Sequence, residues 1–308
     1  MNGSSSSSRI ADLEAIIQED PGERGIKHLH IPGELLAAAE DLVRSKAVAI
    51  ITGFYIWSCQ NGETDGPPGA LAIAKALVSL GKAVSLVTDE ANAPLLQAAL
   101  NASSVKDRVG PIITFPTITS NGGLYRDTEL ASELLLKFDH IVAIERVGPA
   151  EDGKYHNMRG EDITAYCGRA DLLVSLANKL TAHQVRTTGI GDGGNEVGMG
   201  KVKEKVEQHI LHGHAIACAV KADNLITSGV SNWGGYALAA ALFCLHPESS
   251  NILPNIEEES AILDAMVAVG GVDGCLRKSE RSVDGLPFER HAEKLKQLVA
   301  IVERGLEN

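Results

Sequence analysis

The chain has 308 residues, of which 44% are hydrophobic, 22% are charged and only 4% are aromatic. Its 28 basic and 40 acidic residues give a formal net charge of −12, which argues against a nucleic-acid partner. The hydrophobic content excludes a chain that is disordered throughout, and no apolar run reaches the ~18 residues of a membrane span. The five cysteines are widely spaced and form no CxxC pair. This pattern indicates a reducing compartment and neither a disulfide framework nor a zinc site.

The N-terminal segment contains a run of five serines, at residues 4–8. It has neither the arginines of a transit peptide nor the apolar core of a signal peptide. Low-complexity polar segments of this kind rarely form part of a packed core. We therefore predict a flexible tail over residues 1–25, followed by a single α/β domain over residues 26–308.

From residue 33 onward, apolar strands alternate with amphipathic helices. Leu35, Ala39, Leu42 and Val43 recur at helical spacing, which predicts a helix before the first strand. We expect strands over 47–53, 82–88, 111–115, 140–145, 185–190, 215–220 and 223–227, and further helices over 69–80, 92–100, 128–138 and 288–306. Wholly apolar strands that alternate with helices are typical of a parallel sheet covered on both faces. The pattern thus predicts a three-layer α/β/α, Rossmann-like domain with a mostly parallel sheet.

Thirteen of the 31 glycines gather in three segments, 53–69, 189–200 and 229–235. Each segment follows a predicted strand. Ligands of open α/β sheets bind at the carboxyl ends of the strands, and glycine lets backbone N–H groups approach a ligand closely. We therefore expect the three segments to outline one site.

The first glycine segment leads into an alanine-rich helix, whose N-terminus favours anions. Glu63 and Asp65 are candidate catalytic residues there, and Thr64 and Gly66 are candidate substrate-binding residues. The alternative is that Thr64 or Asp65 only caps the helix. The loop has neither GxGxxG nor a following Gly-Lys-Ser/Thr, so it does not match the usual nucleotide-binding loops.

The second glycine segment carries Asp192 and Glu196, which would share a face if this stretch were helical. Their oxygens could ligate a hard divalent cation, or the two residues could act as acid and base. Gly193, Gly194 and Asn195 between them are candidate substrate-binding residues. The alternative is a glycine-rich turn whose polar residues only cap a helix.

The third glycine segment contains Ser231 and Asn232, which either cap the helix that runs through Leu245 or bind a substrate carboxylate. We interpret Trp233 as a core residue.

Glu145 ends a predicted strand, and this position makes it a candidate catalytic residue. Arg146 and Arg159 are candidate anion clamps on an acidic chain. His156 is either a proton shuttle or a solvated loop residue. We interpret the histidines at 209, 212 and 214 as a solvated helix end and not as a metal site.

The loops at 62–69 and 189–200, the Glu-Arg strand end at 145–146 and the Val-Ser-Asn-Trp-Gly segment at 230–234 together resemble the C-terminal module of the D-glutamate cyclase family. The resemblance implies a lyase-type cyclisation of D-glutamate to 5-oxo-D-proline and water. It also implies a mitochondrial matrix location, an amino-acid substrate and a partner in the family's separate N-terminal module.

Such a reaction needs a base for the α-ammonium, an activated γ-carboxyl for the amine to attack, and a clamp for the substrate carboxylate. We expect a divalent cation, Mg²⁺ or Mn²⁺, on Asp192 and Glu196, and no organic cofactor. Two other classes stay open at this point: a phosphate- or nucleotide-handling α/β enzyme, and a non-catalytic binding module of a larger enzyme.

Overall fold

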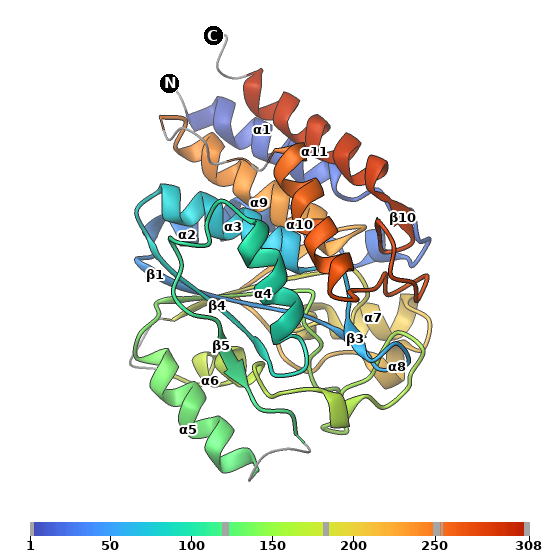
Figure 1. The fold of residues 1–308 in the computed structure, drawn as a ribbon. Helices are drawn as coiled ribbons and strands as arrows, with labels where there is room; N and C mark the ends of the chain where they lie inside the picture. The colour runs from blue at the N-terminus through green and yellow to red at the C-terminus, as the bar shows by residue number, and fades with distance from the viewer. Residues whose placement is uncertain (1–2, 119–122, 181–184, 249–252, 254, 305–308) are drawn as a thin grey trace.

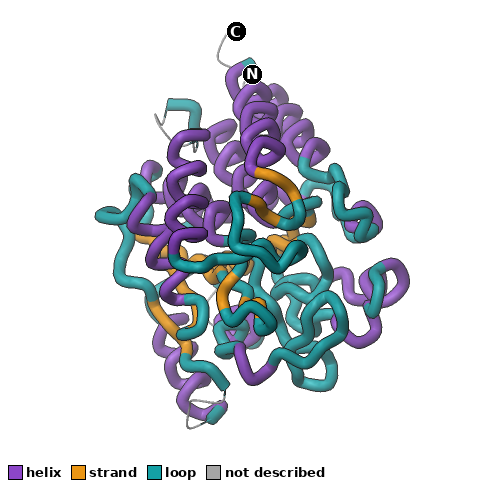
Figure 2. The backbone as a smooth tube through the Cα atoms, turned by 45° about the vertical axis from the view of Figure 1, so that its right-hand side comes forward, coloured by secondary structure: helices purple, strands orange, loops and turns teal. Residues whose placement is uncertain are grey.

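The computed structural model describes residues 3–118, 123–180, 185–248, 253 and 255–304 (Figure 1). Its centre is a six-stranded parallel sheet with the strand order β5-β4-β1-β6-β7-β8. The strands are β1 (Ala47–Thr52), β4 (Ala83–Asp89), β5 (Ile113–Phe115), β6 (His140–Ile144), β7 (Arg186–Gly191) and β8 (Asn224–Thr227). Helices lie on both sides of the sheet (Figure 2), which confirms the predicted three-layer α/β/α architecture.

Two helical layers bury the two faces of the sheet. One layer contains α1 (Gly3–Ile16), α2 (Glu34–Arg44), α3 (Pro67–Ser79), α4 (Ala93–Ala102), α9 (Ser231–Leu245), α10 (Ile256–Ala268) and α11 (Phe288–Glu303). The other contains α5 (Leu124–Leu135), α6 (Leu172–Ala177), α7 (Lys203–His209) and α8 (Gly213–Ile216). Short antiparallel pairs join β2 (Tyr55–Ile56) to β3 (Asn61–Gly62) and β9 (Ser282–Val283) to β10 (Leu286–Pro287). No helix in the described part of the chain has the length and apolarity that crossing a membrane requires.

The N-terminal segment differs from the prediction. Helix α1 begins at Gly3, and Ile10 and Leu13 on it, with Ile17 just after it, are fully buried in the core. The Gly229 N–H donates a hydrogen bond to the Ile17 carbonyl at 2.8 Å, which fastens the segment to the end of β8. The prediction of a flexible tail over residues 1–25 is therefore wrong for the described residues. The apolar spacing of these three residues, which matches one helix face, outweighs the serine run.

The apolar run at 215–220 is not a strand of the sheet. Its first residues belong to α8, and its last residue, Val220, accepts hydrogen bonds from the N–H groups of Gly198 and Gly200. The run is therefore buried under the second glycine segment, and its apolar character reflects burial without sheet pairing.

Helices α3 and α9 cross at two glycines in the middle of the molecule. A Cβ atom on Gly235 would lie 2.7 Å from the Cα atom of Gly69, closer than real Cβ atoms approach. The side-chain oxygen of Asn232, in the first turn of α9, accepts hydrogen bonds from the N–H groups of Gly66 (3.0 Å) and Gly69 (2.8 Å) at the start of α3. The N-termini of both helices therefore face one point at the carboxyl end of the sheet.

We expect Gly235→Ala to lower the free energy of unfolding by about 1–3 kcal/mol, because the added methyl group meets backbone atoms of α3 that cannot rotate away. Urea unfolding measures the change. The matched control is Gly110→Ala, whose Cβ atom would meet only the Ser85 hydroxyl at 3.6 Å. Equal stability of the two variants would contradict the close crossing of α3 and α9.

Candidate active site

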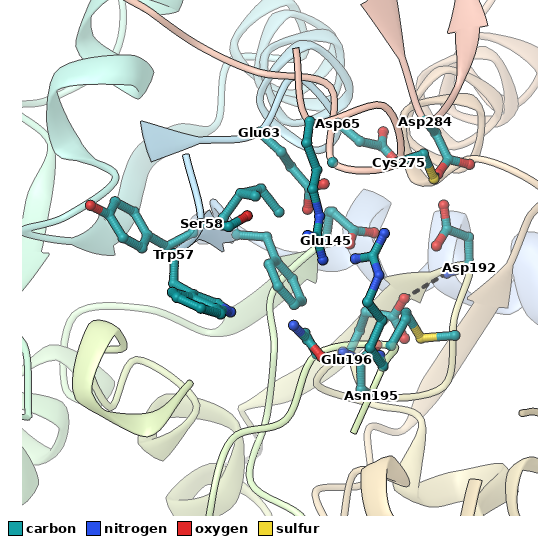
Figure 3. A pocket seen from close by; sticks show the side chains of 18 of the residues that line it. Trp57, Ser58, Glu63, Asp65, Glu145, Asp192, Asn195, Glu196, Cys275 and Asp284 are labelled. Carbon is teal, nitrogen blue, oxygen red and sulfur yellow. Dashed lines mark hydrogen bonds between the residues drawn. The ribbon is translucent and has the colours of Figure 1, made fainter. Parts of the chain in front are cut away.

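A pocket of about 280 Å³ opens at the carboxyl end of the sheet (Figure 3). Six acidic residues (Glu63, Asp65, Glu145, Asp192, Glu196 and Asp284), three arginines (Arg24, Arg159 and Arg277) and several apolar residues (among them Phe54, Ile56, Trp57, Met158 and Leu211) line it. The first two glycine segments therefore meet at one pocket, as predicted, and the third lies directly behind it through Ser231.

Three carboxylates converge at the base of the pocket. Asp65, Glu145 and Asp192 each offer an oxygen, and these oxygens lie within 4.8 Å of one another. Asp65 lies just before α3, Glu145 directly follows β6 and Asp192 directly follows β7. All three side chains are buried. We call them the carboxylate cluster; parallel strands that end at the same edge bring them together.

The N-terminus of α9 holds the carboxylate cluster in place. The Ser231 N–H donates to Asp65 (3.0 Å) and Asp192 (3.2 Å), and the Asn232 N–H donates to Asp65 (2.8 Å). The Ser231 hydroxyl donates to Glu145 at 2.5 Å. Free N–H groups and the helix dipole both stabilise negative charge at this position.

Ser231 and Asn232 are therefore helix residues that bind protein carboxylates, and neither lines the pocket. The N-cap of α9 is Val230, so the first alternative for Ser231 and Asn232, a cap of this helix, is wrong. The second alternative, contact with a substrate carboxylate, is not favoured, because both residues already bind carboxylates of the protein. Thr64 and Gly66 also lie behind the pocket wall. The Thr64 hydroxyl donates to the Ser282 carbonyl at 2.8 Å.

Burial shifts the titration of the carboxylate cluster. It raises the pKa of Asp65 to about 7, and the charge of Asp284 adds to the rise. Burial, together with the neighbouring carboxylates, raises the pKa values of Glu145 and Asp192 well above their ordinary range, although Arg24 opposes the rise at Asp192. Gathered carboxylates in a poorly solvated site either share protons or bind a cation. Three carboxylate oxygens at this spacing are a donor set that suits Mg²⁺ or Mn²⁺.

Glu63 points into the same pocket from the loop between β3 and α3 (Figure 3). Its side chain is only 9% exposed, and no described residue donates a hydrogen bond to its carboxylate. Burial and the charges of Asp65 and Asp284 raise its pKa well above the ordinary value. A Cβ atom on Gly274 would lie 1.9 Å from a carboxylate oxygen of Glu63, so the loop that contains Gly274 packs directly against it.

Arg146 is not an anion clamp, which corrects the prediction. It is 1% exposed, pairs with Asp89 at 2.6 Å, and donates to the carbonyls of Gly53 (2.9 Å) and Gly168 (2.7 Å). These contacts join the ends of β1, β4 and β6. The preceding residue, Glu145, has φ +42°, a left-handed backbone that a non-glycine residue adopts only when its surroundings enforce it.

The side chain of Glu196 binds backbone N–H groups of the second glycine segment. Its two carboxylate oxygens accept hydrogen bonds from the N–H groups of Asp192 (3.0 Å), Gly193 (2.7 Å) and Gly194 (2.6 Å). Residues 192–199 are not helical, so the shared helical face of Asp192 and Glu196 does not form, and Glu196 lies outside the carboxylate cluster. The predicted metal pair is thereby corrected: Asp192 has Asp65 and Glu145 as its neighbours, and Gly193 and Gly194 donate to the protein itself.

Asn195 lines the pocket, and its side-chain amide donates to the His156 carbonyl at 2.8 Å. His156 itself faces Asp152 at 3.0 Å and does not line the pocket, which does not favour a role as proton shuttle. Arg159 does line it, as the prediction of an anion clamp requires.

Sequence reasoning missed Arg24, Arg277 and Asp284. Arg24 pairs with Asp192 at 3.1 Å and with Asp284, and it donates to the Gly229 carbonyl at 3.0 Å. It lies in residues 1–25, the segment predicted to be a flexible tail. Asp284 lies in the turn between β9 and β10, where an Asp-Gly pair signals only a turn.

The fold and the pocket define an α/β protein with a carboxylate-rich site at the carboxyl edge of a parallel sheet. Residues 13–299 match the family described as D-glutamate cyclase-like, C-terminal. The chain is also 38% identical over 336 residues to human "D-glutamate cyclase, mitochondrial", a match that covers 96% of this chain and 52% of that protein. The chain thus spans about half the length of this relative. It belongs to the D-glutamate cyclase family.

Among solved structures, the exonuclease RecJ bound to manganese aligns over 90% of this chain and 66% of its own, with a TM-score of 0.36 and 13% sequence identity. A likeness of this size supports no inference about the chain.

Proposed function

We propose that this chain cyclises D-glutamate to 5-oxo-D-proline and water. The observation that carries the proposal is the convergence of Asp65, Glu145 and Asp192 within 4.8 Å, with the unpartnered carboxylate of Glu63 beside them. The name of the human relative supports the reaction. The pocket volume of about 280 Å³ has room for an amino acid of this size with water or an ion.

The reaction forms a bond between the α-nitrogen and the carbon atom of the γ-carboxyl group, and it breaks one carbon–oxygen bond of that carboxyl. The α-ammonium loses two protons, and both end on the departing oxygen, which leaves as water. No other reactant is needed. A single group that takes a proton from nitrogen and returns it to oxygen serves both steps.

Glu63 fits that role. Its carboxylate faces the pocket without a hydrogen-bond donor, so it is free to accept a proton from the substrate ammonium. Its raised pKa makes it a stronger base than an ordinary glutamate and lets it hold the proton until the oxygen leaves.

The carboxylate cluster would hold a divalent cation, Mg²⁺ or Mn²⁺. When bound, such a cation supplies neutralisation of the γ-carboxylate and polarisation of its carbonyl. Ser231 and the N-terminus of α9 hold Asp65, Glu145 and Asp192 in position. Arg24, which also pairs with Asp284, holds Asp192 through an ion pair. We also propose the mitochondrial matrix as the location, by analogy with the human relative.

Incubation of the chain with D-glutamate and Mn²⁺ or Mg²⁺, followed by chiral chromatography, tests the proposal. We expect 5-oxo-D-proline to accumulate with either cation and to stop accumulating when a chelator is added. If only the full-length relative formed the product, catalysis would belong to its other half, and this chain would be a binding module.

A further inference from the structure

The pocket has two kinds of arginine. The donors of Arg24 are taken up by Asp192, Asp284 and the Gly229 carbonyl. Arg159 and Arg277, which also line the pocket, form no ion pair and no side-chain hydrogen bond with any described residue. We call these two the rim arginines. Their guanidinium groups keep all their donors available for a ligand.

The rim arginines come from separate loops that the fold holds firmly. Asn157 accepts hydrogen bonds from the N–H groups of Arg159 (3.0 Å) and Glu161 (3.1 Å). Arg277 has φ +57°, and its N–H donates to the Asp273 carbonyl at 2.7 Å. The buried Asp273 carboxylate accepts three further N–H groups of the same loop, those of Cys275, Leu276 and Gly285.

The two loops meet on one side of the pocket. The Glu161 carboxylate accepts hydrogen bonds from Asn157 and Trp57, which hold its pKa below the ordinary value, and the charges of Arg277 and Arg159 act in the same direction. The turn at 57–59 touches both loops, because Trp57 donates to Glu161 at 3.3 Å and the Cys59 thiol donates to the Arg277 carbonyl at 3.6 Å. Trp57 in turn lies across the pocket from Asp192 and Asp284 (Figure 3). The loops that carry both rim arginines are therefore joined to a turn that lies opposite Asp192 and Asp284.

We propose that Arg159 and Arg277 form an anion subsite that binds the carboxylate of the substrate that does not react, and that this subsite selects amino dicarboxylates over amino monocarboxylates. The inference rests on the proposed function. In the cyclisation the γ-carboxyl must reach the carboxylate cluster, and the α-carboxylate stays charged in both substrate and product. The pocket has six acidic residues and the chain a net charge of −12, so the surroundings disfavour a second carboxylate. The rim arginines would offset this repulsion by binding the α-carboxylate.

The test compares D-glutamate with 4-aminobutyrate, which has the same spacing of amine and carboxyl but no α-carboxylate. We expect the wild-type chain to prefer D-glutamate, and Arg159→Gln with Arg277→Gln to raise the KM for D-glutamate roughly tenfold or more at nearly unchanged kcat. The kinetics of 4-aminobutyrate should stay the same. Arg126→Gln, which removes an exposed arginine from α5 outside the pocket, should change neither substrate.

Equal changes for both substrates, or no change for D-glutamate, would overturn the subsite. If the wild-type chain turned over neither substrate, the proposed function would fail. The anion subsite would then be tested by calorimetry, which measures the affinity of the wild type and of the double variant for 5-oxo-D-proline. Affinity that falls roughly tenfold in the double variant would still support it. Equal affinity, or no binding by the wild-type chain, would refute it.

Discussion

Replacement of Glu145 by glutamine is expected to lower kcat/KM for D-glutamate by at least about 100-fold without unfolding the chain. Glutamine has the same shape and can still accept the hydrogen bond of the Ser231 hydroxyl. It removes one of the three carboxylates that would hold a cation. Steady-state product formation measures the effect, and circular dichroism checks the fold.

Glu133→Gln is the matched control for Glu145→Gln, because Glu133 is an exposed residue of α5 and does not line the pocket. It should leave kcat/KM unchanged. Activity of Glu145→Gln within a few-fold of the wild type would show that the carboxylate cluster does not carry the reaction.

Asp89→Asn is expected to reduce the free energy of unfolding by about 3–5 kcal/mol, because it leaves the Arg146 charge buried without its partner. The side chains of Asp89 and Arg146 are each about 1% exposed. Asp89 also accepts hydrogen bonds from the N–H group of Gly168 at 3.1 Å and from Asn92. Chemical denaturation with a two-state fit measures the loss.

The exposed pair of Lys154 and Asp162, at 2.9 Å, supplies the control. Asp162→Asn breaks an ion pair whose side chains are 55% and 42% exposed, so its cost should be about 0–1 kcal/mol. Equal costs for Asp89→Asn and Asp162→Asn would contradict the view that Arg146 is a buried anchor beneath Glu145.

The strand-end carboxylates could be predicted from the sequence for a simple physical reason. Glu145 and Asp192 each follow an apolar run, and Asp65 lies in the loop that joins the first strand to its helix. The carboxyl ends of parallel strands and the loops that follow them share one edge, so the proximity of the three residues needs only the fold class. The residues that complete the pocket carry no such signal. Arg24 precedes the first strand, and Asp284 lies in a short hairpin, and only tertiary packing brings them to the edge.

The roles of the residues were harder to predict than their positions. Arg146 and Glu196 lie close to the predicted site, yet both bind the protein itself. Arg146 donates to backbone carbonyl groups, and Glu196 accepts from N–H groups of the second glycine segment. A sequence shows the charge of a side chain but not which backbone groups compete for it. The free arginines of the pocket, Arg159 and Arg277, stand out only after the saturated ones are recognised in the structure.

Calorimetric titration of Mn²⁺ into the chelator-treated chain tests the central claim most directly, because it measures the cation site of Asp65, Glu145 and Asp192 without assuming a reaction. We expect one saturable site in each chain, at least tenfold weaker binding after Asp65→Asn, and tighter binding in the presence of D-glutamate. Absence of saturable binding at millimolar Mn²⁺, or binding that Asp65→Asn leaves unchanged, would contradict a cation site at the carboxylate cluster.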